Sequence, residues 1–214
     1  PTEAPVYDTF LNAAESGTDT YTSPLGRAWE LDASRKGGIF RFRFHKPIYL
    51  FPVRYTDRPN RYPSTPKTKT SVEEKMPMDY NEVMFQLSFK TKLWENFYKG
   101  NGDLWFGYTQ QSHWQLYNSD VSSPFRETNY EPELIFTWRT DVDLFGVNWR
   151  LVNLGLVHQS NGRSEPLSRS WNRMYAQFGF EKDTFVLLAR PWLRIEESGK
   201  NDDNPDIEDY TGNG

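Results

Sequence analysis

Residues 85–93 read Phe-Gln-Leu-Ser-Phe-Lys-Thr-Lys-Leu, with an apolar side chain at almost every second position. Successive side chains of a β-strand point to opposite faces of the sheet, so a period of two predicts a strand and not a helix. One face of this strand would be aromatic and aliphatic, and the other would carry Gln86, Ser88, Lys90 and Lys92. The stretch therefore predicts a sheet with one apolar and one polar face.

The same period recurs in six other segments, at residues 39–44, 104–109, 134–144, 152–156, 174–180 and 185–195. Their polar faces carry Arg, Glu, Asp, Gln and Asn, which could pair inside a lumen, and their apolar faces are broad and aromatic, as in a lipid-facing band. A soluble β-sandwich with one buried face is the alternative. Residues 1–34 lack the period and are expected to be an irregular arm, and the proline-containing residues 55–79 are expected to be a long loop.

Composition agrees with two-faced strands. Of the 214 residues 16% are aromatic, yet the mean hydropathy is −0.80. The chain has no cysteine, which excludes a disulfide framework and a thiol nucleophile. A transmembrane helix needs an apolar run of about 18 residues, and the sequence has none, so no transmembrane helix is predicted. The start Pro1-Thr2-Glu3 does not look like a signal peptide and suits a mature chain. With a net charge of −4 and no basic stripe, no nucleic-acid partner is expected.

The chemistry is expected in residues 152–175, which read VNLGLVHQSNGRSEPLSRSWNRMY. If the strand that contains Leu156 continues with its own period, His158 and Ser160 fall on its apolar face, side by side. A hydroxyl is a weak nucleophile until a base takes its proton, and an imidazole can do so near neutral pH. The spacing therefore suggests a nucleophilic Ser160 with His158 as its base.

Two more residues extend this hypothesis. Asn172 shares the apolar face of the next strand, so its amide oxygen could orient the imidazole of His158. Gly162 lies between the two strands, where its backbone N–H could face an oxyanion. A lone His-x-Ser near a strand end is more often a turn with polar caps. What favours chemistry is that three polar groups occupy otherwise apolar faces, where they are costly without a purpose.

Gln110 is another polar side chain on an otherwise apolar face, because it continues the apolar face of the strand at residues 104–109. A glutamine that points toward lipid needs a partner, which a second copy of the chain could supply. Alternatively, the membrane band ends at Tyr108, and Gln110 lies among the lipid headgroups. The pattern alone leaves both interpretations open.

Two long motifs carry a resemblance. HQSNGRSEPLSRSWNR at residues 158–173 and SSPFRETNYEP at residues 122–132 closely resemble the outer-membrane phospholipase A family, and the similarity runs from about Trp29 to the end. The resemblance implies a twelve-stranded antiparallel transmembrane β-barrel in the outer membrane of a Gram-negative-type cell. It also implies a Ser160–His158–Asn172 triad on the lipid-facing wall. The implied activity is calcium-dependent hydrolysis of acyl esters of phospholipids and lysophospholipids.

The resemblance further implies activation by homodimerisation, with Gln110 at the interface. It implies that Ca²⁺ is bound by Ser168 and the carbonyl of Arg163 of one subunit and by Ser122 of the other. The water on the calcium and the N–H of Gly162 would stabilise the oxyanion. None of these calcium ligands is a strong signal by itself, because a carboxylate-rich loop is the more usual pattern.

The sequence departs from the family pattern at Gln159, Leu167 and, above all, at its end. About seven of twelve strands are expected in residues 35–214, so this barrel domain is expected to be incomplete at the C-terminus, after a periplasmic-type arm at residues 1–34. The acidic stretch at residues 202–206 is expected to be a turn and not a cation site. The competing functions are a passive barrel, such as a porin, and a soluble β-sandwich that binds a partner.

Overall fold

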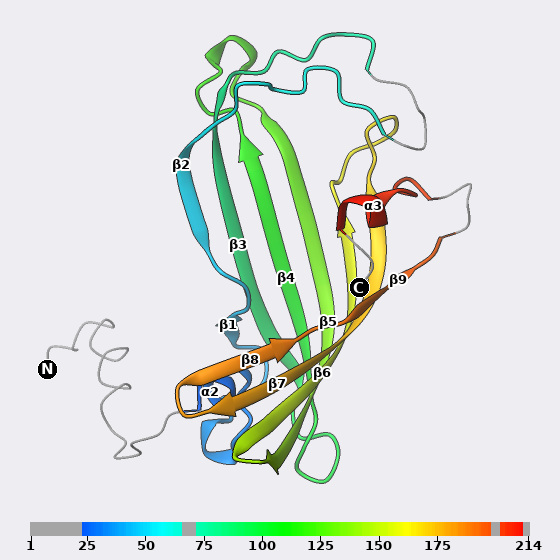
Figure 1. The fold of residues 1–214 in the computed structure, drawn as a ribbon. Coiled ribbons are helices and arrows are strands. Elements are labelled where there is room, and N and C mark those ends of the chain that lie inside the picture. The colour runs from blue at the N-terminus through cyan, green and yellow to red at the C-terminus, as the bar shows by residue number, and fades with distance from the viewer. Residues whose placement is uncertain (1–22, 66–71, 198–201, 212–214) are drawn as a thin grey trace, which may run out of the picture.

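A single antiparallel sheet dominates the computed structural model, which describes residues 23–65, 72–197 and 202–211 (Figure 1). Its strands are β1 (Phe42–Phe44), β2 (Tyr49–Tyr55), β3 (Asn81–Trp94), β4 (Asp103–Trp114), β5 (Phe125–Leu144), β6 (Val147–Ser160), β7 (Ser170–Lys182), β8 (Phe185–Ala189) and β9 (Trp192–Ile195). The helices are short: α2 (Pro24–Trp29), α3 (Ile207–Thr211) and the 3-10 turns η1 (Ala33–Arg35) and η2 (Ser119–Val121). Among the described residues, no helix has the length and apolarity needed to cross a membrane.

The nine strands occupy seven positions across the sheet. Both β1 and β2 pair with β3, and both β8 and β9 pair with β7, so each pair is one interrupted strand. The seven predicted segments match these positions. Strand β2 was not predicted, because Pro52 interrupts its pattern and its pairing shifts register between Phe51 and Arg54. The last predicted segment is divided by Pro191, which cannot donate to the ladder.

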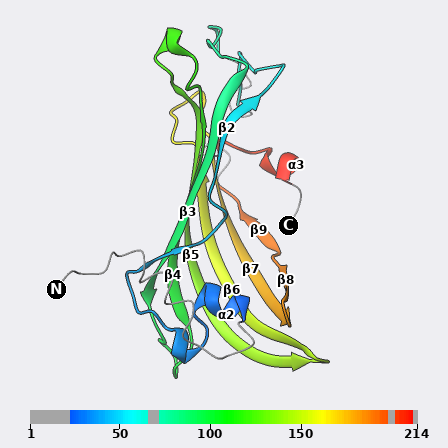
Figure 2. The same cartoon turned by 90° about the vertical axis from the view of Figure 1, so that its left-hand side faces the viewer.

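The sheet curls into part of a barrel (Figure 2). Its apolar side chains lie on the convex, outer face. On the concave face Lys92 and Glu133 are 0% and 1% exposed, whereas Leu156 on the convex face is 53% exposed. A soluble sandwich would bury the opposite face. A wall that exposes its leucines and buries its charges is that of an outer-membrane barrel, which confirms the predicted fold class.

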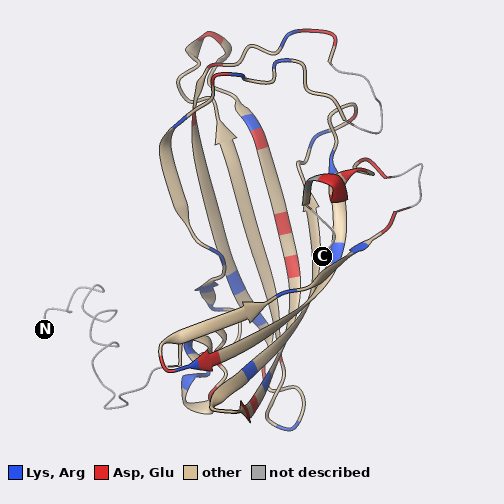
Figure 3. Cartoon of the chain, viewed as in Figure 1, with Lys and Arg blue, Asp and Glu red and all other residues tan. Residues whose placement is uncertain are grey.

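The buried charges of the concave face are paired. Lys92 contacts Glu30, Glu95 and Asp103, with its Nζ atom 2.9 Å from a Glu30 oxygen. Further along the same face, the Glu133 carboxylate lies 2.9 Å from His45 and 3.1 Å from Arg190. Figure 3 shows acidic bands on β5 and a concentration of both signs at the lower end of the sheet. The polar face thus forms ion pairs inside the curl, as a lumen would allow.

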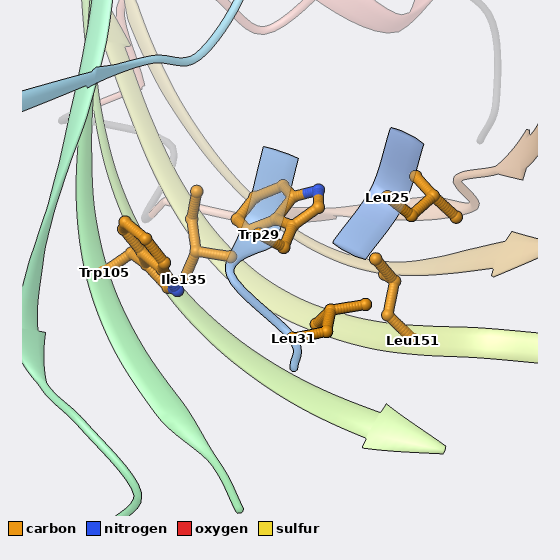
Figure 4. Close-up of a cluster of buried hydrophobic side chains, with 6 residues drawn as sticks. All are labelled: Leu25, Trp29, Leu31, Trp105, Ile135 and Leu151. Carbon is orange, nitrogen blue, oxygen red and sulfur yellow. The ribbon is translucent and has the colours of Figure 1, made fainter. Parts of the chain in front are cut away.

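Helix α2 lies against the concave face at the lower end of the sheet (Figure 1). Ser23 caps it, and Glu181 of β7 accepts hydrogen bonds from the Ser23 hydroxyl (2.6 Å) and the Leu25 N–H (2.5 Å). Figure 4 shows the resulting apolar cluster, which consists of Leu25, Trp29, Leu31, Trp105, Ile135 and Leu151. The segment that we expected to be irregular therefore contains a docked helix, while residues 1–22 lie outside the described residues.

The two ends of the sheet differ in the length of their loops. At the α2 end, β5 and β6 are joined by Phe145 and Gly146 alone, both with positive φ, as in a tight hairpin turn. At the other end, the connections at residues 56–80, 115–124 and 161–169 are long (Figure 1). Barrels of this type have short periplasmic turns and long outer loops. Ser160 ends β6 at the long-loop end, which places the candidate site there.

Candidate functional site

His158 and Asn172 are direct cross-strand neighbours on the outer wall of the sheet. They are register partners on β6 and β7, and the Nδ1 atom of His158 lies 2.8 Å from the Oδ1 atom of Asn172. His158 is exposed on the convex face, in line with Leu154 and Leu156. The structure thus brings together two of the three residues that the alternation of the sequence had placed on one face.

Ser160 follows His158 on the same face and ends the strand, where it is half-buried. Within the described residues, no hydrogen bond joins the Ser160 hydroxyl to the imidazole. Bonds between a nucleophile and its base are often loose without substrate. If the Nδ1–H of His158 donates to Asn172, its Nε2 atom keeps a free lone pair, which is the state that a base for Ser160 requires.

Gly162 is the second residue of the loop after β6 and has a φ of +63°, a conformation that side chains disfavour. A Cβ atom at this position would lie 2.9 Å from the ring of Tyr130, so the loop approaches β5 closely. In the described part of the chain, its backbone N–H donates to no acceptor. A free N–H beside Ser160 is the element that an oxyanion hole needs.

The loop at residues 161–169 is organised by Asn161, which we did not predict. Its side chain accepts from the backbone N–H groups of Arg163 (3.2 Å) and Arg169 (3.0 Å) and donates to the carbonyl of Leu167 (2.8 Å). Asn161 is buried. A short buried amide that satisfies three loop groups is a local signal of a fixed turn, and it fixes the backbone on which Gly162 lies.

The expected calcium ligands offer oxygen atoms only, as Ca²⁺ prefers. The Ser168 hydroxyl donates to the carboxylate of Asp203 at 2.5 Å, and Asp203 also accepts from the Ser170 N–H at 2.7 Å. Asp203 comes from the acidic stretch that we expected to be only a turn. The Arg163 side chain donates to the carbonyl of Arg126, and Ser122 caps η2 in the separate loop between β4 and β5.

The donor set of one copy fits calcium only in part. Beside Ser168 it supplies one carboxylate, which is a stronger ligand than a hydroxyl. Over the described ranges, no group of three or more acidic, histidine or cysteine side chains comes together. Completing the coordination shell of a cation at Ser168 requires oxygen atoms from water or another chain.

Gln110 lies on the outer face of β4 and finds partners within its own strand. Its Oε1 atom accepts from the Tyr108 hydroxyl at 3.2 Å, and its Nε2 atom donates to the Ser112 hydroxyl at 3.1 Å. The cross-strand neighbours of Gln110 are Leu87 on β3, which is half-exposed, and Tyr130 on β5. The amide is therefore not left unsatisfied on the apolar wall, although it remains half-exposed.

Two hollows adjoin the candidate site. A polar cavity of about 710 Å³ at the long-loop end is lined by Ser160, Asn161, Arg126, Arg163 and Arg169, among others. An apolar groove of about 620 Å³ follows the outer wall and is lined by Leu134, Leu154, Leu156, Met174 and Leu193, among others. Leu156 and Met174 are the next outward residues beyond His158 and Asn172. The triad residues thus lie between a polar and an apolar region.

The chain is similar to known phospholipases. The model of the family described as phospholipase A1 matches residues 25–214. A putative phospholipase A1 of Neisseria meningitidis serogroup B is 44% identical over 207 residues, which cover 95% of this chain and 54% of that protein. The phospholipase A1 of Escherichia coli K12 is 48% identical over 132 residues, or 62% of this chain and 45% of that protein. The chain thus spans about half the length of these relatives.

Solved structures of outer-membrane phospholipases also resemble this chain. The Salmonella typhi outer-membrane phospholipase, a dimer with bound calcium, superposes with a TM-score of 0.68 at 38% identity, over 81% of this chain and 65% of that one. An E. coli outer-membrane phospholipase A with an active-site asparagine changed to alanine gives 0.70 at 34% identity, over 87% and 69%. With the outward apolar wall and the matched family model, these findings show that the chain belongs to the phospholipase A1 family of outer-membrane β-barrel proteins.

Proposed function

We propose that this chain belongs to a calcium-dependent outer-membrane phospholipase that hydrolyses acyl esters of phospholipids and lysophospholipids by a Ser160–His158–Asn172 triad. The observation that carries the proposal is the 2.8 Å contact between His158 and Asn172 on the lipid-facing wall. Polar groups on such a wall are costly in free energy unless they serve a purpose. An imidazole that contacts an amide oxygen and lies two residues from a serine on the same strand corresponds to the base, the orienting group and the nucleophile of a triad.

The reaction follows from these groups. The Oγ atom of Ser160 attacks the ester carbonyl carbon while the Nε2 atom of His158 takes its proton, and the Oδ1 atom of Asn172 accepts from the Nδ1–H. The negative charge that develops on the carbonyl oxygen is met by the N–H of Gly162. His158 then gives its proton to the departing alcohol. A water molecule, activated by His158 in the same way, releases the fatty acid from Ser160.

The two hollows suit an amphipathic substrate. The apolar groove along β6 and β7 fits an acyl chain, because it is lined by leucines and begins directly beyond His158 and Asn172. The polar cavity with Arg126, Arg163 and Arg169 fits the glycerophosphate end. A lipid laid across both brings its ester bond to Ser160. A lysophospholipid has the same two ends, so the same placement serves it.

We assign the calcium site to the Ser168 hydroxyl and the Arg163 carbonyl, with Ser122 of the partner subunit, so that activity requires a homodimer. When bound, the cation offsets negative charge at the reacting carbonyl oxygen. The dimer with bound calcium of the related Salmonella typhi protein supports this assignment. Gln110 would lie in the interface, where a partner could exchange hydrogen bonds with its amide. In this proposal, residues 35–214 belong to the barrel and residues 1–34 form an N-terminal arm.

The test is phospholipid hydrolysis in detergent micelles by the full-length protein, with calcium and with a chelator. Calcium-dependent release of fatty acid is expected from the parent protein and not from Ser160→Ala. Heat-modifiable migration on gels should be the same for both, since the side chain of Ser160 supports no described hydrogen bond. No release from folded, dimeric parent protein under either condition would favour the alternative, a passive barrel without catalysis.

A further inference from the structure

Glu197 contacts the candidate triad at Asn172, on the side of the amide that faces away from His158. Its Oε1 atom accepts a hydrogen bond from the Nδ2 atom of Asn172 at 2.6 Å, while the Oδ1 atom of the same amide faces His158. Asn172 therefore lies in a chain of contacts that runs from His158 through the amide to a carboxylate. The sequence did not indicate this residue, because Glu197 lies beyond the proline-interrupted strand at residues 185–195.

We propose that Glu197 is a positioning residue that fixes which end of the Asn172 amide faces His158. This proposal rests on the proposed function, because it concerns the same triad. An asparagine side chain has nearly the same shape in both flipped orientations, and a neutral imidazole can donate or accept through Nδ1. The contact between His158 and Asn172 alone therefore does not select an orientation.

The wrong orientation disables the base. If the NH₂ group of Asn172 faced His158, Nδ1 would have to accept, and the ring proton would move to Nε2. The Nε2 atom could then not accept the proton of Ser160, which lies on that side of the ring in the proposed triad. Only the orientation with Oδ1 toward His158 leaves Nε2 free to act as a base.

A carboxylate selects that orientation because it can only accept hydrogen bonds. Facing Glu197, the amide must present its NH₂ group, which turns Oδ1 toward His158. The 2.6 Å distance between the Asn172 nitrogen and the Glu197 oxygen is at the short end for hydrogen bonds, and bonds to an ionised acceptor are the shorter and stronger ones. Within the described residues, Asn172 is also the only hydrogen-bond partner of Glu197, and no cation lies within ion-pair distance of it. Its charge is thus directed at the triad and not at a salt bridge.

The backbone explains how Glu197 reaches this place. Ile195 of β9 is the register partner of Asn172, and the chain leaves the sheet immediately afterwards. Glu197 is half-buried against the wall, whereas its neighbour Glu196 is exposed. These two glutamates offer a matched pair, because they have the same chemistry and adjacent positions but only one contacts the triad.

The experiment compares Glu197→Gln with the control Glu196→Gln in the full-length protein in detergent micelles. One readout is the ¹⁵N chemical shifts of the His158 ring, which report its tautomer without any turnover. We expect the Nδ1–H tautomer in the parent and in Glu196→Gln, and a mixture in Glu197→Gln, because a glutamine can face Asn172 with either end. The second readout is the kinetics, where kcat should fall roughly 10- to 100-fold with KM nearly unchanged.

Glu197→Asp keeps an acceptor-only carboxylate, so it should retain the Nδ1–H tautomer and most of kcat. This rescue also separates positioning from a loss of folding. An unchanged tautomer in Glu197→Gln, with kcat equal to that of Glu196→Gln, would overturn the proposal. If the parent proves inactive, the proposed function fails, yet the tautomer of His158 in the three variants still decides the role of Glu197.

Discussion

The ring of Tyr175 covers the bare backbone of Gly155, its cross-strand partner on the concave face of the sheet. A Cβ atom at residue 155 would lie 2.2 Å from two ring carbons. The ring is held there, since its hydroxyl donates to Glu133 at 3.1 Å and the guanidinium of Arg190 lies 3.6 Å from its centroid. The absence of a side chain at Gly155 of β6 therefore makes room for the ring of Tyr175 of β7, three residues before His158 on the same strand.

Gly155→Ala is predicted to lower the free energy of unfolding by about 1–3 kcal/mol, because the added methyl group displaces a fixed ring. Urea unfolding of the full-length protein in detergent measures this loss. Leu154→Ala is the control, since Leu154 lies on the same strand but points outward, where it is half-exposed. Equal losses in the two variants would mean that the packing of Tyr175 on Gly155 contributes nothing.

Trp29→Ala is predicted to detach α2. The Lys90 ammonium lies 3.1 Å from the centroid of the Trp29 ring, and Trp29 packs edge-on against Trp105 at 6.0 Å. Truncating a buried tryptophan costs about 3–5 kcal/mol, so hydrogen exchange at residues 25–31 should speed up by roughly a hundredfold or more. Trp94→Ala, at a residue that is 62% exposed, should leave this exchange unchanged. Slow exchange in Trp29→Ala would contradict the docking.

Acid is predicted to release the same helix through Glu30. Burial would raise the pKa of this carboxyl, but the Gly37 N–H, the Lys92 ammonium and the Arg43 guanidinium outweigh it and hold the pKa below its ordinary value of 4.5. A carboxyl with a lowered folded-state pKa contributes its stability above the ordinary value and loses it as the pH falls below. Exchange at residues 25–31 should therefore speed up below about pH 4.5.

Glu30→Gln serves as the control for this pH dependence. It should exchange faster than the parent already at pH 7, because its neutral amide cannot balance Lys92 and Arg43. Its exchange should also lack the parent's additional rise in acid, after correction for intrinsic rates. The same rise in both proteins would assign the acid effect to another carboxylate.

Ser168→Ala is predicted to raise the calcium concentration needed for half-maximal hydrolysis, because it removes one proposed ligand and one of the hydrogen-bond donors to Asp203. A calcium titration of fatty-acid release measures the shift. The matched control is Ser164→Ala in the same loop, whose side chain is exposed. An unchanged requirement in Ser168→Ala would refute the assignment of this ligand, while equal shifts in both variants would point to a general loosening of the loop.

The alternation of side chains predicted most of the fold and part of the site. Because parity along a strand fixes the face, residues 152–160 and 172–178 were enough to place His158, Ser160 and Asn172 on the outer wall. Parity carries no information about contacts between distant segments. The docking of α2 on Glu181 and the contact of Asp203 with Ser168 arise from residues more than 30 positions apart.

Short or interrupted elements were the other source of error. Helix α2 has six residues, which is too short for an amphipathic period to be recognised. Strand β2 has Pro52 at its centre, which argues against a regular strand. Glu197 lies beyond the last periodic residue, where only the path of the backbone brings it to Asn172. These residues depend on tertiary structure, which a local pattern does not encode.

The docking of α2 on the concave face also has an electrical consequence. A barrel closed around this wall holds a turn of helix and the stack of Trp29 on Lys90 where a porin holds water. Charges such as Lys92 and Glu30 are already matched at 2.9 Å, so a permeating ion would have to separate them without gaining a hydrated path. The same packing that stabilises the lower end of the sheet thus occupies, along this part of the wall, the space through which an ion would pass.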